Sequence, residues 1–246
     1  EGELRSTDDI LAETSGPAYE NDFRDKNGNP IKPGKMISIN EDCFRSYPHL
    51  QPKGRVPGEI KILGCTVKRV RSGTALGRSY LGEVFISNTT FKEIAGKGFN
   101  VPSDTRIVDS KGDIRYGLVL DLWGNNKNCE IDITVLPSPV PEGITRHRNA
   151  EQIPLGKEFP MQAARITGSG HRITLKAEGN LEMNRTMPII IGQSGWDSDS
   201  ARDVFLRNET GLPVILTKGT RDCKVITNGE VIRDDGKGNE IKRLGQ

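Results

Sequence analysis

Short apolar runs that end on a small or polar residue recur along the chain. FISN (85–88) is one of eight, and the others are ISIN (37–40), ILGC (62–65), IVDS (107–110), EIDI (130–133), ARIT (164–167), FLRN (205–208) and VITN (225–228). Most of their last residues lie 20 to 25 positions apart, and the longest gap divides if IIIG, which ends at Gly192, is counted. A fixed period of this length, built from short strands, predicts a solenoid.

A second apolar run follows several of these fourth residues directly. TTFKEI follows Asn88, TGLPVIL follows Asn208 and GEVI follows Asn228. Two strands that meet at one residue need a sharp corner, where asparagine and glycine tolerate the left-handed conformation best. If the coils stack about 4.8 Å apart, equivalent asparagine amides are expected to hydrogen-bond along a column.

These motifs resemble the right-handed parallel β-helix of the pectin-lyase-like superfamily. The resemblance is carried by EVFISNTTF, GEIKILGCTVKRV and FLRNETGLPVILTKGTRDCKVITNGEVIRDDGKGN and covers roughly residues 36 to 240. It implies an all-β chain with a right-handed parallel β-helix, a solenoid of about nine coils with long loops, over residues 36–246. Residues 1–35 are then an N-terminal cap or loop segment. A β-sandwich, which also alternates short strands with turns, is the alternative architecture.

The composition agrees with many short strands. The 246 residues include 28 glycines and 14 prolines but only 5% aromatic residues, a balance typical of strands separated by turns. No run approaches the ~18 apolar residues of a membrane span, and the net charge of +2 gives no support for nucleic-acid binding. The chain starts at Glu1 without a methionine, so a removed leader or a place in a longer chain stays open. An oligomer stays open as well.

The four cysteines lie far apart, with neither a CxxC motif nor a zinc-like Cys/His spacing. We interpret them as buried free thiols, with two disulfides as the alternative. No metal constellation is evident. DSDSARD (197–203) matches a calcium loop only loosely and reads better as a turn, so calcium is the single cofactor considered.

The longer gaps between the repeats predict loops. Residues 134–163 include LPSPVPEGITRHRNAEQIPLGKEFP, whose prolines suit neither strand nor helix. We expect this segment to leave the coil and fold over one face, and long loops are where solenoids place function.

The family resemblance implies a carbohydrate-active protein of the extracellular space, the periplasm or the cell surface. Its substrate is then an anionic, uronate-type polysaccharide, cut by lyase-type elimination in a groove on one sheet face. An elimination at a uronic acid needs a cation for the carboxylate, a base and an acid. The alternative is a non-catalytic polysaccharide-binding, adhesin or tailspike-type β-helix module, since no complete catalytic motif of the family is present.

Candidate residues come from four segments that concentrate cations, histidines or aromatic groups. In an extended RYGLVLDLW (115–123), the leucines face the core while Arg115, Asp121 and Trp123 face outward together, as in a sugar subsite. KRVRSG (68–73) is a basic strand, and TRHRN (145–149) and GSGHRI (168–173) add further basic groups. A solvated basic face and a surface salt bridge beside a packed tryptophan are the structural alternatives. The candidate catalytic residues are Lys68, Arg71, Arg115, Tyr116 and His171, and the candidate substrate-binding residues are Arg69, Asp121, Trp123, Arg146, His147 and Arg172.

Overall fold

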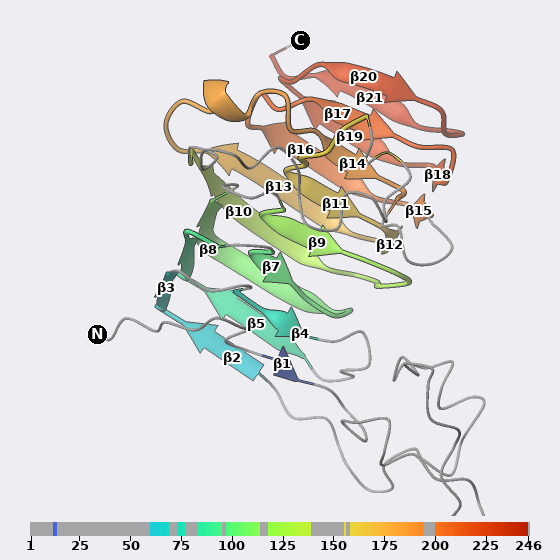
Figure 1. The fold of residues 1–246 in the computed structure, drawn as a ribbon. Coiled ribbons are helices and arrows are strands. Elements are labelled where there is room, and N and C mark those ends of the chain that lie inside the picture. The colour runs from blue at the N-terminus through green and yellow to red at the C-terminus, as the bar shows by residue number, and fades with distance from the viewer. Residues whose placement is uncertain are drawn as a thin grey trace, which may run out of the picture.

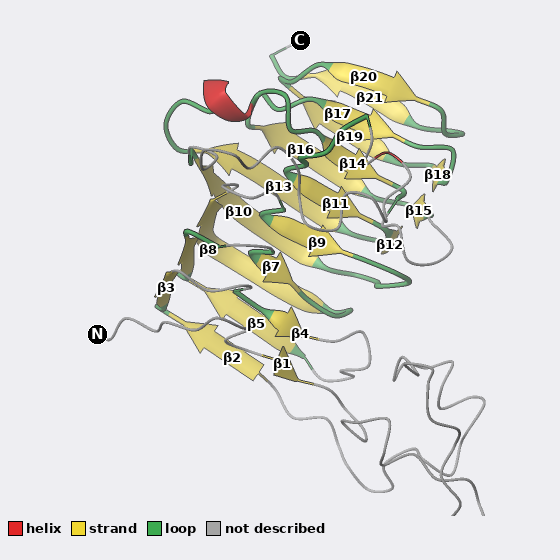
Figure 2. Ribbon diagram, in the orientation of Figure 1, coloured by secondary structure: helices red, strands yellow, loops and turns green. Residues whose placement is uncertain are grey.

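Strands dominate the fold, and every strand pairing in the described residues is parallel (Figures 1 and 2). The structure is a computed structural model that describes residues 12–13, 60–68, 73–76, 83–94, 97–113, 118–138, 155, 158–193 and 200–245. The prediction of an all-β chain with parallel sheets is confirmed. The β-sandwich alternative is wrong, because a sandwich is built from antiparallel strands.

The longest sheet, called sheet I, runs from one end of the stack to the other. Its main strands, in spatial order, are β2 (Ile60–Leu63), β5 (Val84–Ser87), β8 (Thr105–Asp113), β10 (Glu130–Leu136), β13 (Arg172–Ala177), β16 (Phe205–Glu209), β19 (Lys224–Thr227) and β21 (Glu240–Arg243). The short strands β3 (Thr66–Lys68) and β6 (Thr90–Lys92) join it beside β8.

Two further parallel sheets lie along the same stack. Sheet II orders β7 (Phe99–Asn100), β9 (Leu120–Leu122), β11 (Ala164–Ile166), β14 (Ile189–Ile191), β17 (Val214–Leu216) and β20 (Val231–Asp234). Sheet III orders β12 (Gly168–Ser169), β15 (Ala201–Arg202) and β18 (Thr220–Arg221). Outside them lie the pair β1 (Ala12–Glu13) and β4 (Ala75–Leu76) and the 3-10 turn Glu182–Asn184. Of the expected N-terminal segment 1–35, only β1 is within the described residues.

The chain visits the sheets in a repeating order. After β10 in sheet I it forms β11 in sheet II and β12 in sheet III and then returns to sheet I as β13, and the rounds through β16 and β19 repeat this path. Each return places a new strand beside the previous one (Figure 1). Each sheet therefore grows by one parallel strand per round.

The core lies between the inward faces of the sheets. Alternate side chains of sheet I point inward and stack in register, as Ile62, Ile86, Ile107 and Ile131 do. The same column continues to Val225 and Ile241, and Ile241 is 39% exposed because it belongs to the last strand of the sheet. Burial of this continuous apolar column holds neighbouring rounds together.

The repeat positions predicted from the sequence fall on two different sheets. ILGC, FISN, IVDS, EIDI, FLRN and VITN contain strands of sheet I, whereas ARIT and IIIG contain β11 and β14 of sheet II. Counting ARIT and IIIG as equivalents of FISN is therefore wrong. The equivalent strand is β13, which pairs with both β10 and β16. Its sequence, RITLKA, ends without the corner residue that defined the search.

The corner prediction is correct at Asn88 and wrong at two other asparagines. Asn88 has a φ of 48° and continues a left-handed column with Gly64 and Asp109. Asn208 instead lies buried inside β16, where its amide donates to Leu212 O and Thr227 Oγ1. Asn208 and Asn228 do not adopt positive φ, so the expected column of stacked asparagine amides does not form.

A second left-handed column precedes the strands of sheet I. Six residues with positive φ each stand just before such a strand: Asp104, Asn128, Gly170, Asp203, Asp222 and Gly238. Backbone hydrogen bonds link these corners to the neighbouring round, as from Asp203 N to Arg221 O. Aspartate and asparagine accept this conformation through local hydrogen bonding, and three of the six residues of the second corner column are aspartates.

The prediction that segment 134–163 leaves the coil is wrong at its start, because residues 134–136 belong to β10. Its described later part lies over sheet II, as expected of a loop that covers a face. Leu155 N donates to Gln193 Oε1, and Glu158 pairs with Arg233 of β20 at 2.7 Å. Residues 139–154 lie outside the described part of the chain.

Cys65, Cys129 and Cys223 are free thiols, and the latter two are buried. The prediction of buried free thiols is confirmed for Cys129 and Cys223, whereas Cys65 is a free thiol that is only partly buried. Cys43 lies outside the described ranges.

Candidate functional site

The outward face of sheet II carries a column of buried side chains. In register, this column contains Asn100, Asp121, Arg165, Ile190 and Ile215. Their strand neighbours point inward and belong to the hydrophobic core, so these five residues point away from it. All five are nevertheless buried. Charged groups in such a place have to be paired.

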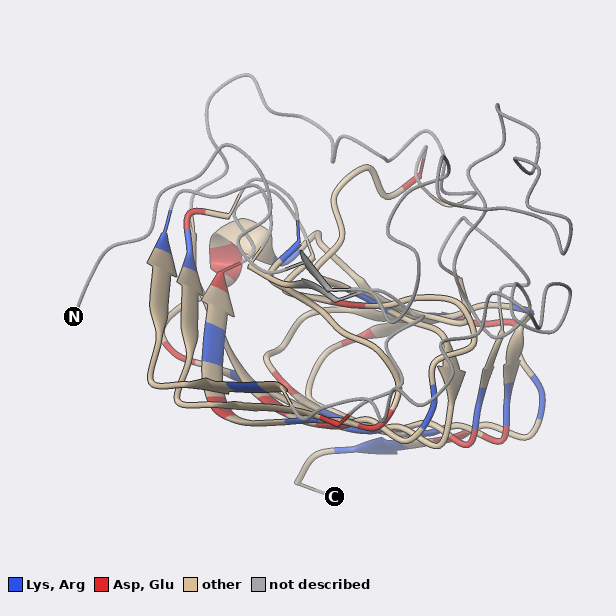
Figure 3. Ribbon diagram, turned by 90° about the horizontal axis from the view of Figure 1, so that it is seen from below, with Lys and Arg blue, Asp and Glu red and all other residues tan. Residues whose placement is uncertain are grey.

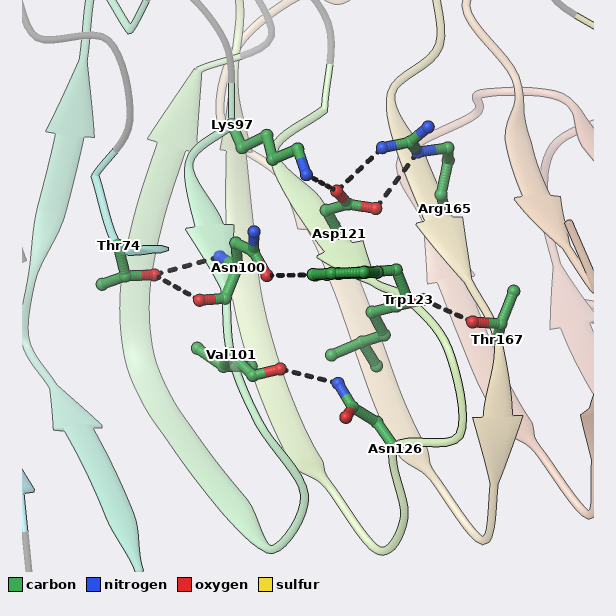
Figure 4. A network of polar contacts seen from close by, with 10 residues as sticks. Thr74, Lys97, Asn100, Val101, Asp121, Trp123, Asn126, Arg165 and Thr167 are labelled. Atoms are coloured by element: carbon green, nitrogen blue, oxygen red, sulfur yellow. Dashed lines mark hydrogen bonds and ion pairs between the residues drawn. The ribbon is translucent and has the colours of Figure 1, made fainter. Parts of the chain in front are cut away.

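Asp121 is the centre of a buried ion cluster (Figure 4). Arg165 donates two hydrogen bonds to this carboxylate, from Nε to Oδ1 at 3.1 Å and from Nη2 to Oδ2 at 2.8 Å. Lys97 Nζ lies 2.6 Å from Oδ2. The side chains of Asp121 and Arg165 are 0% exposed, whereas that of Lys97 is 18% exposed. Solvent therefore reaches the cluster from the lysine side.

The environment fixes the charge of Asp121. Burial by itself raises the pKa of this carboxyl, but the charges and hydrogen bonds of Arg165 and Lys97 outweigh burial and lower the pKa to about 2. The carboxylate therefore stays ionised near neutral pH and is unsuited to acid or base catalysis there. Of the two cations that pair with this carboxylate, Lys97 is the one that solvent reaches.

An aromatic side chain lies beside the exposed end of the cluster. The Lys97 ammonium lies 5.6 Å from the centroid of the Trp123 ring, within the range of a cation–π contact. Trp123 Nε1 donates to Asn100 Oδ1 at 2.9 Å, and Asn100 N in turn donates to Thr74 Oγ1 at 3.0 Å. Trp123 is half-buried, and its indole is held by the hydrogen bond to Asn100 and by the contact with Lys97.

Polar contacts also hold the turn that follows Trp123 (Figure 4). Thr167 Oγ1 donates to Leu122 O and Gly124 O, both at 3.0 Å. Asn126 Nδ2 donates to Val101 O at 2.8 Å. Gly124 has a φ of 77°, which favours glycine at this turn. Asn100, Asp121 and Arg165 of the cluster thus lie on three neighbouring strands of sheet II, and hydrogen bonds fix the turn beside them.

The structure separates the predicted site residues. Asp121 and Trp123 come together as expected, and both project away from the core, but the expectation that Asp121 is exposed is wrong because the outer face of sheet II is covered. Lys68 lies on β3, which pairs with β6 beside sheet I, and Arg172 is exposed on β13 of sheet I. Neither shares the sheet II face with Asp121. Arg69, Arg71, Arg115, Tyr116, Arg146 and His147 lie outside the described residues.

His171 holds the backbone instead of facing a ligand. It is buried, its Nδ1 accepts from Cys129 N at 3.1 Å, and its Nε2 lies 3.0 Å from Thr167 O. Burial lowers its pKa to about 4, against the opposing effect of its backbone hydrogen bonds. Asn239 does the same in a later round, where its Oδ1 accepts from Cys223 N. With both ring nitrogens engaged in this way, the catalytic role predicted for His171 does not fit its position.

Sequence reasoning missed Lys97, Arg165 and Asn100. Arg165 lies 44 positions from Asp121, and only strand register brings the two together. A signal was present in ARIT, where an arginine sits between two residues that face the core. Aligning that arginine with the aspartate of LDL would have placed the two side chains on adjacent strands.

No protein-family model matches the chain, and no curated protein sequence matches it.

Among the described residues, no three histidine, cysteine, aspartate or glutamate side chains are grouped so that they could hold a metal ion. Within the same ranges, no helix has the length and apolar character of a membrane crossing. Of the candidate calcium segment 197–203, only residues 200–203 are described.

Proposed function

We propose that the chain is a right-handed parallel β-helix that binds an anionic, uronate-type polysaccharide on the outward face of sheet II. The fold proposal is supported by the repeating path through three sheets and by the parallel register of each new strand. The pectin-lyase-like resemblance adds the class of ligand.

One observation carries the ligand proposal. The Lys97 side chain is partly exposed, and its ammonium lies beside the Trp123 ring. An acidic sugar needs a cation for its carboxylate and an aromatic surface for its ring, and this corner of the site offers both. Asp121 and Arg165 are buried behind it, so they position Lys97 and do not contact the ligand themselves.

Lyase-type cleavage is a second proposal at the same place. Lys97 can neutralise the uronate carboxylate, which is the first requirement of an elimination. Asp121 does not serve as the base, because its carboxylate is buried and both of its oxygens are engaged. The acid–base roles stay with the sequence candidates Arg115 and Tyr116, which lie outside the described residues. Binding without cleavage is the better supported function.

Titration calorimetry with uronate oligosaccharides tests the proposal. We expect binding to a uronate oligomer and none to a neutral glucan of equal length. Trp123→Ala is expected to weaken binding by about tenfold, the loss typical of one stacking aromatic contact. Lys176→Ala, which removes an exposed cation on sheet I, is the control and should leave affinity unchanged.

The same samples decide between binding and cleavage. An unsaturated product, followed by its absorbance, supports the lyase proposal, whereas binding without product supports the binding module. Equal affinity of the Trp123→Ala variant and the unaltered chain would place the ligand elsewhere and contradict the sheet II site.

A further inference from the structure

Basic side chains stack in a single column along sheet III. Strand register aligns Lys127 with Ser169, Ser169 with Arg202, Arg202 with Arg221, and Arg221 with Lys237. The four cations are exposed, and Figure 3 shows blue segments side by side near the right-hand edge of the stack. We call Lys127, Arg202, Arg221 and Lys237 the cation column.

Such a column is electrostatically unfavourable for the folded chain. Adjacent parallel strands lie about 4.8 Å apart, so Arg202, Arg221 and Lys237 follow one another at that interval. Like charges opposite one another on neighbouring strands repel. Among the described residues, the ion pair recorded for the column joins Arg202 to Asp203 at 3.3 Å. The fold alone gives no reason to keep three consecutive cations in register.

The neighbouring acidic column restricts what can bind here. Asp203 and Asp222 directly follow Arg202 and Arg221 in the chain and occupy left-handed corners, and Asp104 occupies the corner beside Asn128. Four cations and three carboxylates leave this rim with a formal charge of +1. A broad polyanionic surface would meet the carboxylates as well. A narrow ligand that places its anionic groups on the cation column avoids them.

We propose that the cation column binds a linear anionic polysaccharide that lies along the stacking direction, with its carboxylate or sulfate groups spaced to match successive strands. Guanidinium groups bind both kinds of anion through paired hydrogen bonds. The column fits duplex DNA less well, because the phosphates of each strand follow one another about every 3.4 Å of helix axis. This surface is distinct from the Lys97 and Trp123 site and does not rest on it.

Paired variants of the full chain test the column. R202S/R221S/K237S removes three cations from the column, and R106S/R172S/K224S removes two arginines and one lysine from the exposed face of sheet I. The probes are polygalacturonate, which carries carboxylates, dextran sulfate, which carries sulfates, and double-stranded DNA. Affinity is measured for each probe over a series of salt concentrations.

We expect the column variant to lose about tenfold in polysaccharide affinity, since each exposed charge pair contributes modestly, and to show a smaller dependence on salt. The sheet I variant should match the unaltered chain, and Arg221→Ser alone should give a partial loss. The relative response to the two polysaccharides shows whether carboxylate or sulfate is preferred. Equal losses in both triple variants, no polysaccharide binding by the unaltered chain, or tighter binding of DNA would each overturn the proposal. Circular dichroism of every variant confirms that these exposed substitutions leave the fold intact.

Discussion

Asp121→Asn is the most direct test of the ion cluster on sheet II. The substitution keeps the size of the side chain and removes its charge. Arg165 then stays fully buried but loses its ion pair with the Asp121 carboxylate, while Lys97 can turn toward solvent. We expect a large loss in the free energy of unfolding, because removing one partner of a buried ion pair is strongly destabilising.

Two independent estimates give the size of this loss. Breaking a buried ion pair by removing one partner costs about 3–5 kcal/mol. The lowering of the Asp121 pKa from 3.8 to about 2 corresponds to about 2 kcal/mol of preferential stabilisation of the carboxylate. We therefore expect a loss of about 3 kcal/mol for the asparagine variant.

Urea unfolding at neutral pH, followed by circular dichroism, measures the effect. Asp132→Asn is the matched control, since Asp132 forms a half-exposed pair with Lys176 at 2.8 Å and should lose at most about 1 kcal/mol. The double variant D121N/R165M removes both buried charges and should recover part of the loss. If D121N and D132N lose equal stability, the argument from burial is refuted.

The same cluster predicts a pH dependence at the acid end. Because the folded-state pKa of Asp121 lies below its ordinary value, its stabilising contribution is complete above about pH 4 and is lost as the pH falls toward about 2. D121N should lack this component of acid unfolding. An identical acid transition in both proteins would contradict the assignment.

Buried groups elsewhere in the stack give three more expected outcomes. His171→Asn keeps an acceptor for Cys129 N but removes the titratable imidazole. The unaltered chain should lose stability as the pH falls from about 6.5 toward 4, and the variant should lack this loss, as measured by urea unfolding at several pH values. Burial raises the pKa of Cys129 to about 12 and also raises that of Cys223, so mass spectrometry after thiol labelling at pH 8 should find both cysteines modified only in urea. Asn208→Ala leaves the hydrogen-bond partners of a buried amide unsatisfied and should lower the free energy of unfolding by about 2–3 kcal/mol. A loss below about 1 kcal/mol would show that other groups replace these hydrogen bonds.

The strand class and its parallel pairing could be predicted because apolar runs recur at nearly constant spacing. Ile62, Ile86 and Ile107 occupy equivalent positions in consecutive strands, and this spacing is directly visible in the sequence. The assignment failed at ARIT and IIIG because a strand of sheet II has the same alternation as one of sheet I. Local pattern does not record which sheet a strand joins.

The corner residues were harder to predict because several side chains satisfy the same backbone requirement. Asn88 follows the expected rule, but the left-handed position is taken by Asp109 in the next round and by Gly64 in the round before. Asn208 is used for its amide inside a strand. Asparagine is therefore a signal for two different local structures, and only the pairing of its neighbours distinguishes them.

The candidate site could be predicted in part. Alternation in LDLW correctly turned Asp121 and Trp123 away from the core, but it carried no information about what covers that face. The partners Lys97 and Arg165 come from other rounds, 24 and 44 positions away. Their meeting depends on the loop lengths between strands, which the local pattern does not determine.

The exposed Ile241 at the end of the apolar column shows how the stack limits its own growth. In the described part of the chain, β21 has a neighbour on only one side, so its free backbone groups could template a foreign strand and seed aggregation. Glu240, Lys242 and Arg243 surround the isoleucine on this strand. An incoming apolar segment would have to desolvate these charges, so they act as gatekeepers that keep the protein from polymerising end to end.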